Sequence, residues 1–365
     1  MKKLIIIGLG HAWNQFYSKV VAELKNQRLI TLEGTIDPRF TEMSGQEFAV
    51  VRGNWHAARF EEIPSGAIDP DTMVMILTPD HYFVIEELAT MGFKQILCEK
   101  PLVSRPLEIE RVKGLIDVYD LKLYAIDFYL PKTLGLQVMR GLVGPDDPRY
   151  GWMSISDPSA DFEKMLGDIE GIGVQVIEAG DFCLPDVAGR PYLANDKQIG
   201  GMILDLVTHV CGPLYQAGLL QDWSVEATSL ARMRSVMCGP LVPVKNGDEV
   251  EMYVTALLHA GGIPIHLAFG KVPFERGGLW SLEIRGKKGM YYAGLRTGQP
   301  SVLVSNNGRV VTFVLNMTTH EFVIREALLY FDGKLPGFDG NFGAFTASME
   351  VGQSILRHYH RLASD

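Results

Sequence analysis

Over the first third of the chain, short apolar runs alternate with longer stretches that carry apolar residues at helical spacing. The apolar runs read as parallel strands that are covered on both faces, and they are residues 3–8, 30–37, 72–78, 95–98 and 122–127. The stretches between them predict helices, at residues 12–26, 80–91 and 107–119. This alternation predicts an α/β domain built on a doubly wound parallel sheet.

The pattern changes after about residue 131. Glycine- and proline-rich turns occupy residues 143–151, and the runs at 250–258 and 263–269 then alternate between apolar and polar positions. Alternation is typical of antiparallel strands with one solvated face. We therefore expect residues 1–127 to form the first domain. Residues 128–365 should form an α+β domain with a large, mostly antiparallel sheet, whose C-terminal helix could pack back on the first domain.

Composition and charge narrow the classes of protein. The chain has 365 residues, of which 47% are hydrophobic and 21% charged, with a formal net charge of −9. This length is sufficient for two hydrophobic cores, and the acidic balance argues against binding to nucleic acid. We expect no nucleic-acid partner.

Four scattered cysteines, Cys98, Cys183, Cys211 and Cys238, indicate neither a zinc site nor a disulfide framework. The apolar run after Lys3 is too short for a signal peptide. No stretch approaches the roughly 20 apolar residues of a membrane span. The expectation is a soluble, cytoplasmic protein without a metal or a membrane partner.

A glycine turn follows the first predicted strand and precedes the first predicted helix. It holds Gly8 and Gly10, followed by His11, Ala12 and Trp13. In this context the first glycine permits a tight turn, and the second lets the backbone approach a pyrophosphate at the helix N-terminus. Trp13 replaces a third glycine, so it must either turn outward over a cofactor or sit in a wider helix–strand gap. Taken alone, the string fits an ordinary glycine-rich turn equally well.

Asp37 ends the second predicted strand. A carboxylate at this position can accept hydrogen bonds from the ribose hydroxyls of NAD. Arg39 could instead pair with the 2′-phosphate of NADP, so NADP stays possible. The alternative is that residues 37–39 form a turn with a capping aspartate.

Two further strand ends carry polar residues that should reach the same edge of the sheet. The third strand is followed by Thr78, Pro79 and His81, and the fourth by Glu99, Lys100 and Pro101. We expect these residues to contact the cofactor. Lys100 would also project toward the reacting part of a substrate, where a lysine can donate to a hydroxyl and relay a proton.

Two glycines at 200–201 precede Asp205 and His209. If this segment is helical, the acid and the imidazole lie on one face and could bind substrate and transfer a proton. The alternative is a surface or capping pair. Further candidate substrate contacts are Asp127, Tyr129, Arg190 and Lys197; for the last two, a solvated loop is equally consistent.

The ordered set of these motifs resembles the Gfo/Idh/MocA family, which includes glucose–fructose oxidoreductase and inositol dehydrogenase. The resemblance implies a Rossmann domain followed by a sheet domain, and an NAD(P)-dependent enzyme whose catalytic group is Lys100, Asp205 and His209. Three departures concern cofactor geometry and substrate identity: Trp13 at the third glycine, residues 127–129 where Gly-Phe is common, and Gly212 where an acidic residue is frequent.

The expected function is hydride transfer between a nicotinamide and a hydroxyl or keto carbon of a sugar, polyol or related small molecule. Two alternatives stay open. One is a reductase of the same fold that acts on a non-sugar ketone or a carbon–carbon double bond; the other is a non-enzymatic NAD(P)-binding sensor. We also expect a homodimer or homotetramer formed through the C-terminal sheet.

Overall fold

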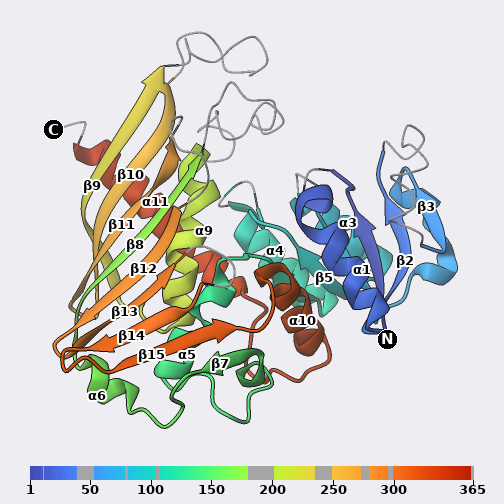
Figure 1. Cartoon of the computed structure of the whole chain (residues 1–365). Helices are drawn as coiled ribbons and strands as arrows, with labels where there is room; N and C mark the ends of the chain where they lie inside the picture. The colour runs from blue at the N-terminus through green and yellow to red at the C-terminus, as the bar shows by residue number, and fades with distance from the viewer. Residues whose placement is uncertain are drawn as a thin grey trace. The chain divides into compact units, whose positions relative to one another are not determined.

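The computed structural model describes residues 1–10, 12–38, 53–78, 81–103, 105, 107–179, 201–234, 249–272, 279–294 and 299–362 (Figure 1). The chain divides into two compact units. Unit 1 comprises Met1–Asp127 and His320–Phe342, and unit 2 comprises Phe128–Thr319 and Gly343–Asp365.

Unit 1 is built on a six-stranded sheet in the order β3-β2-β1-β4-β5-β6, with every pair parallel. Its strands are β1 (Lys2–Ile7), β2 (Ile30–Ile36), β3 (Trp55–Ala57), β4 (Met73–Ile76), β5 (Gln95–Cys98) and β6 (Lys122–Ala125). The predicted doubly wound parallel sheet is therefore confirmed. The sequence pattern did not predict β3, because a strand of three residues at the sheet edge contains no apolar run.

The helices of unit 1 are α1 (Ser18–Asn26), α3 (His81–Met91), α4 (Leu107–Tyr119) and α10 (Thr319–Phe331), with short 3-10 turns at Phe60–Glu62 and Ser65–Ala67. Three of these helices (α1, α3 and α4) lie within the predicted stretches, and α10 was not predicted. The sequence pattern groups residues 320–342 with the second domain. They belong to unit 1 because α10 buries Val323, Ile324 and Phe331 in the same core as Leu4 and Ile6 of β1.

A π-helical turn, η1 (Trp13–Tyr17), precedes α1. The side chains of Trp13 and Tyr17 are 2% and 0% exposed and join the core of unit 1. Trp13 therefore turns inward and not outward over a cofactor. A third glycine at this position would let the helix pack closely against the strand. The indole of Trp13 needs more space, and the wider π-helical turn is consistent with that need.

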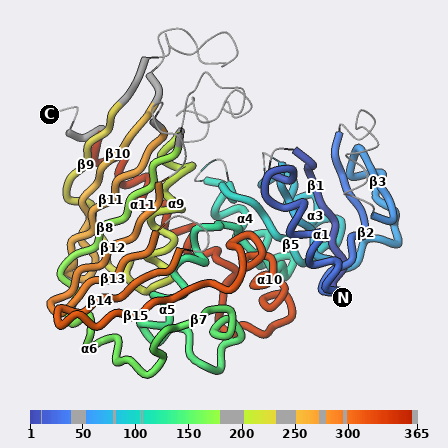
Figure 2. Tube along the Cα trace, in the orientation of Figure 1, coloured from blue at the N-terminus to red at the C-terminus, as the bar shows by residue number. Residues whose placement is uncertain are grey.

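Unit 2 is built on a nine-stranded sheet in the order β7-β15-β14-β13-β12-β8-β11-β10-β9. The strands are β7 (Met153–Ile155), β8 (Ile169–Ala179), β9 (Trp223–Arg234), β10 (Glu249–Ala260), β11 (Ile263–Val272), β12 (Leu279–Gly286), β13 (Gly289–Gly294), β14 (Ser301–Ser305) and β15 (Val310–Leu315). Only β8 and β11 pair in parallel, and Figure 2 shows β8 between β11 and β12 although it precedes both in the chain. The predicted, mostly antiparallel sheet is confirmed.

Helices cover one face of this sheet (Figure 1). They are α9 (Gly201–Gln216) and α11 (Phe342–Leu362), and the unit also holds α5 (Leu134–Met139), α6 (Phe162–Leu166) and the 3-10 turns Leu130–Thr133 and Tyr150–Trp152. Gly352 of α11 lies so close to α9 that a Cβ there would be 2.9 Å from a methyl carbon of Leu204. No helix within the described part of the chain is long and apolar enough to cross a membrane.

Candidate functional site

The strand ends of unit 1 come level at one edge of its sheet. The register pairs Ile7 of β1 with Ile36 of β2 and Ile76 of β4, and Ile76 in turn with Cys98 of β5. The residues that follow these strands therefore begin at the same height. In an open α/β sheet, this carboxyl edge is where ligands bind, at the point where strand order reverses. Here that point lies between β1 and β4.

Gly8 occupies the reversal point. Its φ is +90°, and a Cβ on it would lie 2.6 Å from Thr78 Cγ2 and 3.1 Å from the Thr78 backbone nitrogen. Only glycine fits between these two strand ends. Thr78 Oγ1 is buried and has no hydrogen-bond partner within the described residues. A close backbone approach beside an orphaned buried hydroxyl suits the phosphate-binding turn of a dinucleotide site.

Asp37 holds this turn from the neighbouring strand end. Its side chain is only 3% exposed, and Oδ2 accepts a hydrogen bond of 2.6 Å from the backbone N–H of Leu9. The carboxylate thus fixes the glycine turn in addition to any contact with a ribose. Gly10 and Ala12 are partly buried beside it. Of the predicted cofactor contacts, His11, Arg39 and Pro79 lie outside the described residues.

At the end of β5, Glu99 is buried and hydrogen-bonded on both oxygens. The phenol of Tyr17 donates to Oε1, and the backbone N–H of Lys100 donates to Oε2 at 2.8 Å. Burial raises the pKa of the Glu99 carboxyl, while these two hydrogen bonds act in the opposite direction. Tyr17 was missed from the sequence; its spacing of one helical turn from Trp13 indicates a shared buried face.

His81 and Lys100 lie at the same edge as Glu99. Nδ1 of His81, the first residue of α3, donates to the carbonyl oxygen of Pro101 at 2.7 Å. The Lys100 side chain is partly exposed, in contrast to the buried Glu99 beside it. Unit 1 therefore brings together the predicted residues of three strand ends.

Unit 2 carries the predicted acid and imidazole. Asp205 and His209 lie one turn apart on α9 and are 2% and 0% exposed, so they are not a surface pair. Asp205 Oδ2 lies 3.2 Å from Lys271 Nζ, which also contacts Glu178 Oε2. Lys271 is itself 3% exposed. The buried aspartate therefore has a cation beside it, which it shares with a second carboxylate; a buried charge requires such a partner.

The position of Lys271 in the sequence carries a signal of its role, although Lys271 is not among the predicted site residues. Along β11, Ile265, Leu267 and Phe269 point into the core, and Lys271 continues the same alternation. A lysine at a core-facing position requires a partner. Glu178 is its neighbour on β8.

Aromatic rings surround His209. The ring centroids of Tyr129 and Phe128 lie 4.4 Å and 5.7 Å from that of His209, and Trp280 Nε1 donates to the His209 carbonyl oxygen at 3.0 Å. Tyr129 is thus beside His209, and Asp127 is buried at the end of unit 1. Arg190 and Lys197 lie outside the described residues.

No protein-family model matches this sequence, and no curated protein does so either. Solved structures share its fold over nearly the whole chain. A levoglucosan dehydrogenase in complex with NADH and levoglucosan has a TM-score of 0.71 at 15% identity, covering 98% of each chain. A 3-ketoreductase from Actinomadura kijaniata, in complex with NADP and TDP-benzene, has a TM-score of 0.69 at 17% identity, covering 98% of this chain and 97% of its own.

A putative myo-inositol dehydrogenase from Sinorhizobium meliloti has a TM-score of 0.67 at 15% identity, covering 99% of this chain and 98% of its own. At these identities the likeness establishes the fold. This chain therefore has the two-part fold of these oxidoreductases, as the resemblance to the Gfo/Idh/MocA family implied.

Tyr17→Phe tests the buried Tyr17–Glu99 hydrogen bond. Loss of the phenol O–H should raise the pKa of Glu99 further and lower the free energy of unfolding by about 1–3 kcal/mol where Glu99 is ionised. The loss should be larger at pH 8 than at pH 5, because protonation of Glu99 at low pH removes the charge that the phenol stabilises. Urea denaturation at both pH values measures it.

Tyr330→Phe is the control for this substitution. Tyr330 also lies in unit 1, where it is partly buried, but its phenol makes no hydrogen bond within the described residues. We expect a small, pH-independent change. An equal loss for Tyr17→Phe at both pH values would show that Tyr17 contributes packing alone.

Proposed function

We propose that this chain is an NAD(P)-dependent oxidoreductase that transfers a hydride between a nicotinamide and a hydroxyl or keto carbon of a sugar, polyol or related small molecule. The observation that carries the proposal is the glycine cradle at the strand-order reversal, where Gly8 meets Thr78 and Asp37 holds the Leu9 amide. Similar structures support it, since they contain NADH with levoglucosan, NADP with TDP-benzene, or NAD.

The residues of unit 1 fit a dinucleotide. The backbone of Gly8 and Gly10 would approach the pyrophosphate, and Asp37 would accept from the ribose hydroxyls. The unpartnered Thr78 hydroxyl would donate to the bound nucleotide. When bound, the nicotinamide supplies the acceptor or donor of the hydride.

Protein side chains would accept and donate the proton of the reacting hydroxyl. We assign His209 as the general base and Lys100 as the donor that stabilises negative charge on the substrate oxygen. Asp205 would hold a neighbouring hydroxyl or orient His209, with its carboxylate fixed by Lys271. Because Lys100 and His209 belong to different units, their action on one substrate is inferred from the family resemblance.

Asp37 should favour NAD over NADP, because its negative charge opposes a 2′-phosphate. Asp37 also accepts a hydrogen bond from the Leu9 amide. The experiment must therefore separate the effect of its charge on the 2′-phosphate from its support of the glycine turn. Asp37→Asn keeps an oxygen for Leu9 and removes the charge, and it should reduce the preference for NADH over NADPH about tenfold, which corresponds to about 1.4 kcal/mol. Asp37→Ala should weaken the binding of both. Fluorescence titration of the two nucleotides measures each affinity; tighter NADPH binding by the unmodified protein would contradict the assignment.

Lys100→Met and His209→Ala should each lower kcat by about 10² to 10⁴, the usual cost of removing a positioned proton-transfer group. NADH affinity should change little, since Gly8 and Asp37 dominate it. Steady-state kinetics across free and phosphorylated sugars, polyols and nucleotide sugars, with parallel NADH titrations, measure both. Near-normal kcat in both variants would refute the mechanism, whereas collapse of NADH binding would favour the sensor.

We further propose a homo-oligomer formed through the open face of the nine-stranded sheet. Exposed apolar side chains lie on the strands of that face: Leu279, Met290, Tyr292 and Val310 are each 39–51% exposed. A patch of this kind on a sheet commonly binds a second copy. The registers of β12, β13 and β14 place Glu283, Tyr292 and Val302 in one row across it.

Tyr292→Glu should shift the protein toward a 40.5 kDa monomer, because a carboxylate in the middle of the contact would be desolvated. Tyr215→Glu on α9 is the matched control, since Tyr215 is also 40% exposed and lies off the sheet. Light scattering at micromolar concentration measures the mass of each variant. A monomeric unmodified protein would overturn the proposal.

A further inference from the structure

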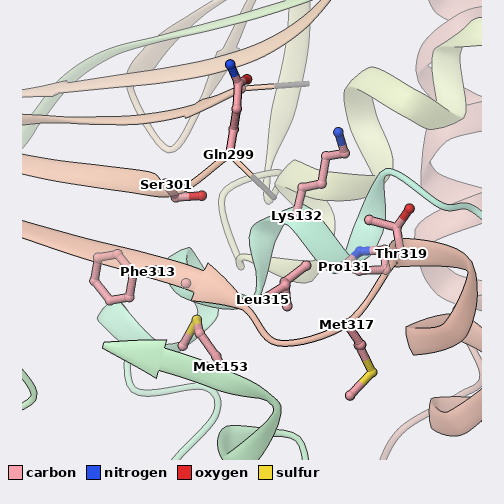
Figure 3. Close-up of a pocket in the computed structure, with 11 residues that line it drawn as sticks. Pro131, Lys132, Met153, Gln299, Ser301, Phe313, Leu315, Met317 and Thr319 are labelled. Carbon is pink, nitrogen blue, oxygen red and sulfur yellow. The ribbon is translucent and has the colours of Figure 1, made fainter. Parts of the chain in front are cut away.

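Unit 2 contains a pocket near the end of the sheet formed by β13, β14 and β15 (Figure 3). The polar side chains that line it are Lys132, Gln299, Ser301 and Thr319. The large apolar ones are Met153, Phe313, Leu315 and Met317. In the view of Figure 3 the polar ends lie in the upper half and the apolar side chains below them.

Lys132 is unusual among the lysines of this chain. Its side chain is buried, with a residue exposure of 9%, yet no carboxylate or carbonyl within the described residues accepts from its ammonium group. Its Nζ lies 5.6 Å from the ring centroids of both Tyr129 and Trp280. Desolvation lowers the Lys132 pKa to about 8, so the amine is still largely protonated at neutral pH.

Among the described residues, the lining carries one positive charge and no negative one. A buried charge without a counter-ion is costly, and two aromatic faces compensate an ammonium only in part. Lys271 in the same unit differs from Lys132, because Lys271 contacts two carboxylates. A lone ammonium beside neutral hydroxyl and amide groups is suited to a ligand that brings its own negative charge.

We propose that this pocket binds a carboxylate through Lys132, with Ser301 and Thr319 as neutral hydroxyl donors. The one ammonium in the described part of the lining matches the single charge of a carboxylate, whereas a phosphate dianion generally requires more cationic groups. The apolar half of the pocket accepts the carbon skeleton that bears the carboxylate. The ring centroid of Tyr129 lies 5.6 Å from Lys132 Nζ and 4.4 Å from the ring centroid of His209.

The carboxylate has two possible sources, a substituent of the substrate or a separate small acid. The first depends on the proposed oxidoreductase function, and the second does not. Binding is therefore measured without activity, on the full chain labelled with [¹³Cε]lysine. The Lys132 resonance is assigned by its loss in Lys132→Arg, and the titration itself uses the unmodified protein.

Acetate should shift the titration midpoint of the Lys132 resonance upward from about 8, because a bound carboxylate stabilises the ammonium. Chloride at equal ionic strength should shift it much less. The exposed Lys164, which pairs with Asp161, is the internal control and should respond alike to both salts. Acetate affinity should fall about tenfold for each pH unit above the Lys132 pKa, as the amine loses its charge.

Kinetics distinguish the two sources. If the carboxylate belongs to the substrate, a uronic acid should be preferred over its neutral parent sugar. Lys132→Met should then raise the KM for the acid about tenfold, and Lys132→Arg should restore the preference. If the ligand is a separate acid, acetate shifts the Lys132 resonance without any preference for uronic acids.

Equal effects of acetate and chloride on Lys132, together with no preference for the uronic acid, would overturn the carboxylate site. This failure is distinguishable from failure of the proposed function. NADH binding and turnover of neutral sugars test the oxidoreductase, and neither depends on acetate binding at Lys132.

Discussion

The absence of a side chain at Gly8 is the constraint on which the carboxyl edge of unit 1 depends. The strand order reverses between the two central strands, β1 and β4, and the backbone of Gly8 lies against Thr78 with no space for a Cβ. Because β1 and β4 are level at Ile7 and Ile76, this contact fixes the height of both following turns. Asp37, which follows β2, then connects the end of that strand to the glycine turn by accepting a hydrogen bond from the Leu9 amide. A larger residue at position 8 would separate the strand ends that form the proposed nucleotide site.

Buried charge organises unit 2 in a comparable way. Asp205, Lys271 and Glu178 form a linked group in which one ammonium contacts two carboxylates, so removal of the lysine would leave both carboxylates without this cation. Such a loss is strongly destabilising. Lys132 contacts no carboxylate in the described part of the chain, and its Nζ lies over two aromatic rings. The contrast argues that Lys271 serves the internal structure, whereas the charge of Lys132 is directed at something outside the chain.

Much of the fold followed from hydrophobic periodicity because it is local. The strands of unit 1 other than β3, and helices α3 and α4, begin and end within a few residues of the predicted limits. Hydrophobic periodicity could not predict contacts between residues that lie far apart in the sequence. Tyr17 meets Glu99 across 82 residues, and α10 joins a core whose strands lie about 200 residues earlier or more. Lys271 was detectable in principle, since a lysine at a core-facing strand position demands a partner, but the identity of that partner depends on the pairing of β8 with β11.

The same distinction explains why the fold is shared so widely while sequence comparison finds no match. Solved structures cover about 98% of the chain at 15–17% identity, and the sheet requires only that most positions be apolar and of suitable size. The fold requires a particular residue type at only a few positions. These are the glycine at the strand-order reversal, the carboxylate that accepts from the glycine turn, and the buried charged residues that contact one another. The turn of this chain keeps the required glycine at position 8. At the third glycine position it has a tryptophan, which is buried within a π-helical turn. The fold therefore tolerates change even inside its most recognisable motif, provided that the backbone at Gly8 keeps its close approach to Thr78.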